Sequence, residues 1–180
     1  MELKKATPWD KSIRSGGKLL IWDEISVGKW STVFAMALES FNTNMKAAGV
    51  QVEAAPSKGR AHVIMKLSPS RITHGKALIG LKDPGRDVIM EAEIMLPDDP
   101  RVHETQEEAS VDQRHVIAVH ELIHAAGLSN YDHGGDGLFN SPLTPLNGKF
   151  YYGQKGRNQA LMPPIRIGKS IINKVGQLWK

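Results

Sequence analysis

The residues of this chain that could do chemistry stand close together in the stretch His120-Glu121-Leu122-Ile123-His124. The two histidines are four residues apart, so on a helix their imidazoles lie one turn apart on the same face and can bind one metal ion. Glu121 is beside them, where its carboxylate can take a proton from a metal-bound water. This H-E-x-x-H pattern predicts a hydrolytic metal site, but five residues alone also give false matches, so the rest of the chain must support it.

A catalytic zinc site needs a third protein ligand in addition to the two histidines. Glu121 is the last glutamate of the chain and the chain has no cysteine, so a later glutamate or a thiolate is excluded as that ligand. The remaining donors after the motif are Asp132, His133 and Asp136. The upstream histidine candidates are His74, His103 and His115. His115 is expected to be structural, because it falls on a different helix face from His120.

The stretch that follows the motif resembles the metzincin zinc peptidases and is most similar to their matrixin branch. H-E-x-x-H continues as x-x-G-L, so Gly127 corresponds to the glycine at which these enzymes turn the chain back towards the metal. The segment A-L-M-P-P at 160–164 is similar to their Met-turn, which implies that Met162 lies beneath the zinc. The expected order of elements also matches over most of the chain, whereas the specific motifs cover only 120–133 and 160–164.

The chain departs from the family where the third histidine is expected. That position, three residues after Gly127, is Asn130, and a histidine follows only at His133, as if three residues had been inserted at 129–131. We interpret His133 as the third zinc ligand, because imidazole suits zinc better than an amide and a longer loop can still bring it to the metal. Asp132 is the next candidate and Asn130 the last. If none of them reaches the metal, the site is weak or inactive.

The resemblance also implies a cleft for an extended peptide. Residues 88–96 alternate between apolar and polar, which predicts a half-exposed strand. We expect this strand to form the upper rim of the cleft, with a free edge that can pair with a substrate. The substrate-binding residues assigned on this basis are Ile94 and Met95 in the strand, and Pro164 and Ile165 after Met162. Arg166 stands where matrixins usually place a tyrosine in the pocket wall, so the size of the pocket is not predicted.

Other elements must hold these residues in place. Ser110-Val111-Asp112-Gln113 is a capping box that predicts the start of the active-site helix, and Gly127 predicts its end. A second long helix, capped by Ser31, is expected from there to about 48, stopped by Gly49. Short strands are predicted at 19–22, 50–54, 61–67 and 77–81. Residues 129–160 are expected to be loops without a clear strand, and a last helix begins near 169.

These elements predict a single domain of the α+β class. With the family resemblance, this becomes a metzincin-like catalytic domain: a twisted, mostly parallel sheet with an antiparallel edge strand, two long helices, and a small loop-rich C-terminal lobe with a final helix. The 180 residues are enough to bury a core. We divide the single zinc peptidase domain (1–180) into a loose N-terminal arm (1–17), an N-terminal lobe (about 18–127) and a C-terminal lobe (about 128–180).

Composition limits the cofactors and partners. The net charge is +4, but residues 83–112 contain 10 acidic and only 2 basic residues. The acidic loop at 97–108 fits no calcium-loop pattern, so we expect it to be solvated, with a structural Ca²⁺ as the alternative. The basic residues form no arginine-rich run, so no nucleic-acid partner is expected. We expect a monomer without a membrane span; since no secretory signal is visible, it would be cytoplasmic or exported by another route.

The expected function is that of a zinc-dependent endopeptidase, with one catalytic Zn²⁺, Glu121 as the general base, and a protein or peptide as the substrate. The alternative is a catalytically inactive module of the same fold that binds a peptide or protein without cleaving it. A further alternative is a basic nucleic-acid-binding or surface-binding protein in which the H-E-x-x-H pattern is accidental.

Overall fold

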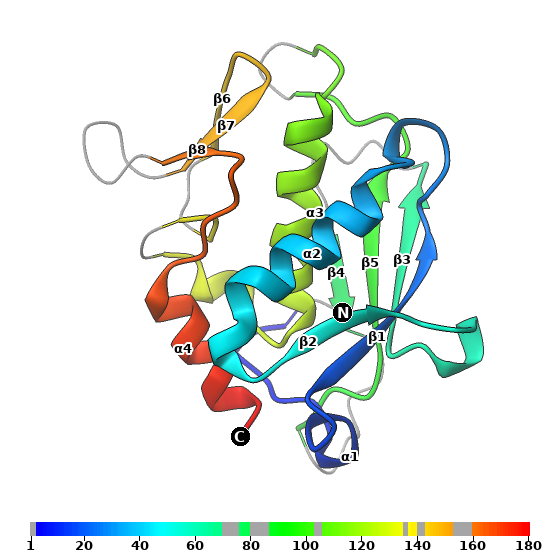
Figure 1. Ribbon diagram of the computed structural model, residues 1–180, viewed down its shortest axis with the longest axis vertical. Helices are drawn as coiled ribbons and strands as arrows, with labels where there is room; N and C mark the ends of the chain where they lie inside the picture. The colour runs from blue at the N-terminus through cyan, green and yellow to red at the C-terminus, as the bar shows by residue number, and fades with distance from the viewer. Residues whose placement is uncertain are drawn as a thin grey trace.

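The computed structural model describes residues 3–69, 76–79, 87–102, 106–134, 137–139, 143–152 and 160–180. Within these ranges the chain forms a five-stranded sheet with two long helices beside it, and a smaller three-stranded sheet with a final helix (Figure 1). The α+β class predicted from the sequence is thereby confirmed. None of the helices in the described ranges is long and apolar enough to cross a membrane.

The main sheet is mostly parallel, as predicted. Its strands are β1 (Lys18–Glu24), β2 (Gln51–Ala54), β3 (Val63–Ser68), β4 (Lys76–Ile79) and β5 (Ala92–Pro97). They lie in the order β2-β1-β3-β5-β4, in which every neighbouring pair is parallel except β5 and β4. The antiparallel strand at the edge is therefore β4.

The predicted free edge of the strand at 88–96 is wrong. Ile94 of β5 pairs with Met65 of β3 on one side and with Ala77 of β4 on the other, so both edges of this strand are occupied. The strand begins at Ala92 rather than at 88. Before it, Ile89 is fully buried, because it forms a parallel bridge with Trp9 of the N-terminal segment. The alternation of residue types identified a strand here but carried no information about which strand lies outside it.

Two helices pack against each other and against the main sheet, and a continuous core of buried apolar side chains lies between these layers. They are α2 (Val33–Met45), extended by the short helix η2 (Lys46–Ala48), and α3 (Val111–Ala125). α2 contacts β2, while α3 contacts β4 and β5 (Figure 1). Gly49 ends the α2–η2 segment with φ +77°, as predicted. The predicted cap Ser31 is wrong, since the N-cap residue of α2 is Thr32, which makes no side-chain capping hydrogen bond.

The N-terminal segment, predicted to be a loose arm, is packed against the rest of the fold in its described part. Trp9 is fully buried, and its indole Nε1 donates a hydrogen bond of 2.7 Å to the Ala125 carbonyl at the end of α3. Pro8 O and Asp10 N also form backbone hydrogen bonds with Ile89. The short helix α1 (Lys11–Arg14) then leads into β1, with Gly16 and Gly17 in the turn. Short helices η1 (Gly28–Trp30) and η3 (Lys58–Arg60) lie in later connections.

The C-terminal part contains strands that were not predicted. β6 (Leu143–Leu146), β7 (Lys149–Tyr152) and β8 (Ala160–Met162) form an antiparallel sheet, and α4 (Lys169–Leu178) is the predicted last helix. β6 and β7 are joined by Asn147-Gly148, which both have positive φ. Asn-Gly is the preferred two-residue hairpin turn, so the signal for this hairpin was present in the sequence.

Candidate metal centre

Helix α3 holds two of the three histidines. Its first turn is closed by the predicted capping box: the Ser110 hydroxyl accepts a hydrogen bond from Gln113 N, and the Gln113 side chain accepts one from Ser110 N. His120 and His124 lie on the last turns of this capped helix, where their spacing of four residues brings them to one face. His124 and Glu121 are buried, with exposed fractions of 8% and 4%.

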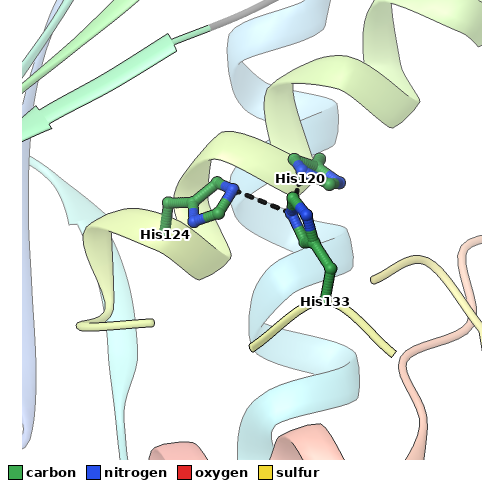
Figure 2. Close-up of side chains that lie close together, drawn as sticks. All are labelled: His120, His124 and His133. Carbon is green, nitrogen blue, oxygen red and sulfur yellow. Dashed lines mark hydrogen bonds between the residues drawn. The ribbon is translucent and has the colours of Figure 1, made fainter. Parts of the chain in front are cut away.

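A third histidine closes the group from the loop after α3. His133 Nε2 lies 3.1 Å from His120 Nε2 and 3.2 Å from His124 Nε2 (Figure 2). The three ligand atoms all lie within 4.8 Å of one another. For a tetrahedral metal with bonds to nitrogen of about 2.0–2.1 Å, two ligand nitrogens are about 3.3 Å apart. The distances from His133 to His120 and to His124 are thus close to those between two nitrogens that bind the same metal ion.

The ring of His124 is oriented by a backbone carbonyl four residues later in the chain. Its Nδ1 lies 2.9 Å from the carbonyl oxygen of Leu128. Because a carbonyl can only accept a hydrogen bond, Nδ1 carries the proton and the lone pair of Nε2 faces the other two histidines. This is the arrangement in which a second interaction fixes the ring of a metal ligand.

Residues 129–131, interpreted from the sequence as an insertion, lie in a compact turn. Its residues build the short helix η4 (Asn130–Asp132), after which His133 points towards α3. Asn130 is exposed. Asp132 does not join the histidines: its Oδ2 accepts hydrogen bonds from Ser129 N and Oγ, and its Oδ1 pairs with Lys174. Of the three candidates for the third ligand, the structure thus brings His133 to the group and not Asp132.

Local charges and burial shift the pKa values in this loop. Burial lowers the pKa of His133, while the nearby charge of Asp132 opposes that shift. Burial alone would raise the pKa of Asp132, but the hydrogen bonds from Ser129 and the ammonium of Lys174 outweigh it, so this pKa lies below its usual value. At neutral pH the loop therefore presents a neutral imidazole, the form that binds a metal.

Gly127 is required by the backbone at the end of α3. Its φ is +117°, and a Cβ at this position would lie 2.4 Å from the carbonyl oxygen of Thr7. Thr7 N in turn donates a hydrogen bond of 2.8 Å to Gly127 O. A side chain would both strain the backbone and separate the N-terminal segment from the turn that leads to His133.

Phe139 belongs to the centre but was missed in the sequence. It is fully buried, and its ring centroid lies 4.9, 4.8 and 4.5 Å from those of His120, His124 and His133. Phe139 O accepts a hydrogen bond of 2.9 Å from Gly134 N, directly after the third histidine. One aromatic ring thus supports all three imidazoles, and no motif or periodicity around 134–139 indicated it.

The other predicted site residues have different positions. Met162 is fully buried at the end of β8, a strand that contacts α3, and bends follow at 163–164. Its place beneath a metal stays a prediction. Pro164 is exposed and Ile165 half-buried, and their contact with a substrate also stays a prediction. Ile94 is fully buried and Met95 half-buried within the paired strand β5, so their assignment loses the free edge on which it was based.

His115 is structural, as expected. It is buried between α3 and α2, where its Nε2 lies 2.9 Å from Ser40 Oγ and 3.1 Å from Met36 O. The remaining candidates, His74, His103 and Asp136, lie outside the described residues.

The carboxylates of Asp99 and Glu108, in the described part of the acidic loop, form ion pairs. Lys29 Nζ lies 2.6 Å from Asp99 and 3.1 Å from Glu108. Arg101 pairs with Asp99, and Arg114 pairs with Glu108. Across the described residues, the only group of three or more candidate metal-ligating His, Cys, Asp or Glu side chains is the three histidines.

Comparison with known proteins adds no family to this picture. Neither a protein-family model nor a curated protein sequence matches the chain. The chemistry of the site therefore has to be inferred from its own residues.

Proposed function

We propose that this protein is a zinc-dependent endopeptidase. The observation that carries the proposal is the convergence of three imidazole nitrogens, two of them on the helix that also carries the buried Glu121. Three neutral histidines with an open fourth position are a ligand set found in catalytic zinc sites. When bound, zinc would lower the pKa of a water towards neutrality and polarise the carbonyl of the scissile bond.

Glu121 would move the proton in this reaction. It directly follows His120 in α3 and has an exposed fraction of 4%, and both observations support its assignment as the base. Its carboxylate would accept a proton from the attacking water and then deliver it to the amine nitrogen that leaves. A neutral amide at this position could do neither, because it cannot hold and release a proton near neutral pH.

An extended substrate would bind along β4 rather than β5. β4 is the last strand of the main sheet in the described part of the chain, and it contacts the active-site helix α3. A peptide in the extended conformation can add to such an edge through backbone hydrogen bonds. The substrate would then lie at the sheet edge next to α3, the helix that carries His120 and His124.

The proposal is tested by the exchange Glu121→Gln, which keeps the size of the side chain and removes its basicity. We expect the zinc-loaded variant to cleave a fluorophore-labelled unfolded protein about 10²–10⁴-fold more slowly than the wild type. Its zinc content should be unchanged, because Glu121 is not a ligand. Glu39→Gln, at an exposed position of α2, is the matched control and should keep full activity.

Equal cleavage rates in wild type and Glu121→Gln would sink the proposed mechanism. A wild type that binds zinc but cleaves no substrate would instead favour the inactive binding module. The main ground for that alternative was a missing third ligand, and the approach of His133 to 3.2 Å or less from the other two imidazoles argues against it.

A further inference from the structure

The turn that carries His133 is closed by a set of hydrogen bonds around one carboxylate. Asp132 Oδ2 accepts from Ser129 N at 2.9 Å and from Ser129 Oγ at 2.7 Å, and Asp132 N donates to Ser129 O at 3.0 Å. Three bonds between the first and last residues of this turn fix its length. They hold the three residues 129–131 in a compact form, so that the chain reaches α3 again at His133.

The other oxygen of the same carboxylate is bound from a distant element. Lys174 Nζ on α4 lies 3.1 Å from Asp132 Oδ1, and the Asp132 side chain is only 15% exposed. α4 is itself anchored, since Ile171 and Val175 are buried and the Trp179 indole donates to Ala126 O at 3.0 Å. The turn is therefore attached to a helix that is fixed relative to the end of α3.

From this geometry we infer that Asp132 and Lys174 are positioning residues for the third metal ligand. The inference rests on the proposed zinc site. His120 and His124 are fixed by their helix, whereas His133 is on a loop and must be ordered before it can bind. The Ser129–Asp132–Lys174 contacts order it in the folded protein, so this conformational entropy is not lost when zinc binds.

A rival account gives the same residues opposite roles. If Asp132 turned inward and bound zinc itself, Lys174 would compete with the metal for the carboxylate. Removal of Lys174 would then leave zinc affinity unchanged or raise it. If Asp132 and Lys174 are positioning residues, removal of either must lower zinc affinity, and an arginine at 174 must restore it.

The experiment measures zinc affinity by competition with a chromophoric chelator, so it does not depend on cleavage. We expect Asp132→Ala to weaken zinc binding about 10–100-fold, as for other residues that orient a ligand. Lys174→Met should weaken it about two- to fivefold, because the ion pair is partly exposed, and Lys174→Arg should return it to the wild-type value. Absorption spectra of the Co²⁺-substituted proteins report whether His133 remains bound.

Two control variants separate positioning from general damage. Tyr131→Ala changes an 83% exposed side chain in the same turn and should leave zinc affinity unchanged. Lys18→Met removes an exposed ion pair with Glu53 of 2.7 Å on the main sheet and should also leave it unchanged. Thermal unfolding of the metal-free proteins checks that each variant folds.

Wild-type zinc affinity in a folded Asp132→Ala protein would overturn the inference. So would a Lys174→Met protein that binds zinc as tightly as, or more tightly than, the wild type. If the expected pattern of affinities is found but no substrate is cleaved, the inference stands and the proposed peptidase activity fails. A wild type that binds no zinc would overturn both.

Discussion

At the scale of single residues, Phe139 is the side chain that connects the three histidines. Its ring lies against all three imidazoles at centroid distances of 4.5–4.9 Å. An apolar surface behind the ligands excludes water from one side and limits the rotation of each ring. We therefore expect Phe139 to affect metal binding as well as folding.

The exchange Phe139→Ala separates these two effects. It should lower the free energy of unfolding of the metal-free protein by about 3–5 kcal/mol, since it empties a fully buried site. It should also weaken zinc binding about 10-fold or more, because the imidazoles lose a common support. Chemical denaturation gives the first quantity and chelator competition gives the second.

Phe41→Ala is the matched control, because Phe41 is equally buried but belongs to α2. It should lower stability by a similar amount and leave the zinc affinity of the folded protein unchanged. If both variants bind zinc like the wild type, Phe139 is only a core residue.

The residue scale also shows which parts of the site a sequence can reveal. His120 and His124 were predictable because their geometry follows from a spacing of four on one helix. His133 could be chosen over Asn130 because the two side chains differ as metal ligands. The ion pair of Asp132 could not be predicted, since its partner Lys174 lies 42 residues later in the chain.

At the scale of elements, most local signals were reliable, apart from the cap assigned to Ser31, and pairing partners were not. The capping box at Ser110 and the glycine at 127 correctly predicted the ends of α3, because both act within a few residues. Each main-sheet strand was also predicted within a few residues. The position of β5 inside the sheet was not, because strand order is set by contacts between distant segments. The Asn147-Gly148 hairpin was an available local signal that was not used.

The contact between α2 and α3 should make stability depend on pH. Burial of His115 lowers its pKa below the usual value of 6.5, although a hydrogen bond to Met36 and the charges of Asp112 and Glu39 partly oppose the shift. The folded protein therefore resists protonation at a site that the unfolded chain protonates readily. The buried neutral imidazole therefore contributes fully to the free energy of unfolding above pH 6.5. This contribution is lost as the pH falls below 6.5 towards the folded-state pKa.

We expect the metal-free wild type to lose stability as the pH falls below 6.5, and His115→Gln to lose less. The glutamine amide can still donate a hydrogen bond to the Ser40 hydroxyl but cannot bind a proton in this range. Urea unfolding across this pH range measures the free energy of unfolding of both proteins. The contribution of the other histidines is the same in both and cancels in the difference. Parallel curves for the two proteins would show that His115 does not cause the loss.

In the whole molecule, segments near both described ends of the chain meet at the last turn of α3. The Trp9 indole donates to Ala125 O at 2.7 Å, and the Trp179 indole donates to Ala126 O at 3.0 Å. These carbonyls have no partner within the helix, so the two tryptophans satisfy groups that a helix end leaves open. The same turn leads through Gly127 to His133. The two tryptophans thus fix the start of the loop that carries His133 from two sides. No local sequence pattern could indicate this, because both contacts join distant segments.

This arrangement links metal binding to the stability of the entire domain. A metal that binds only the folded chain stabilises it in proportion to the logarithm of its free concentration over its dissociation constant. Zinc should therefore raise the unfolding temperature of the wild type, and it should do so much less when one ligand is removed.

The most direct test of the three-histidine centre is the zinc affinity and stoichiometry of the wild type and of His133→Ala, measured by equilibrium dialysis. We expect one zinc per wild-type chain, and a loss of affinity greater than about 100-fold in His133→Ala, beyond the range of residues that only orient ligands. Asn130→Ala, on the same turn, should bind zinc like the wild type. A wild type that binds no zinc, or a His133→Ala protein that binds it undiminished, would contradict the account.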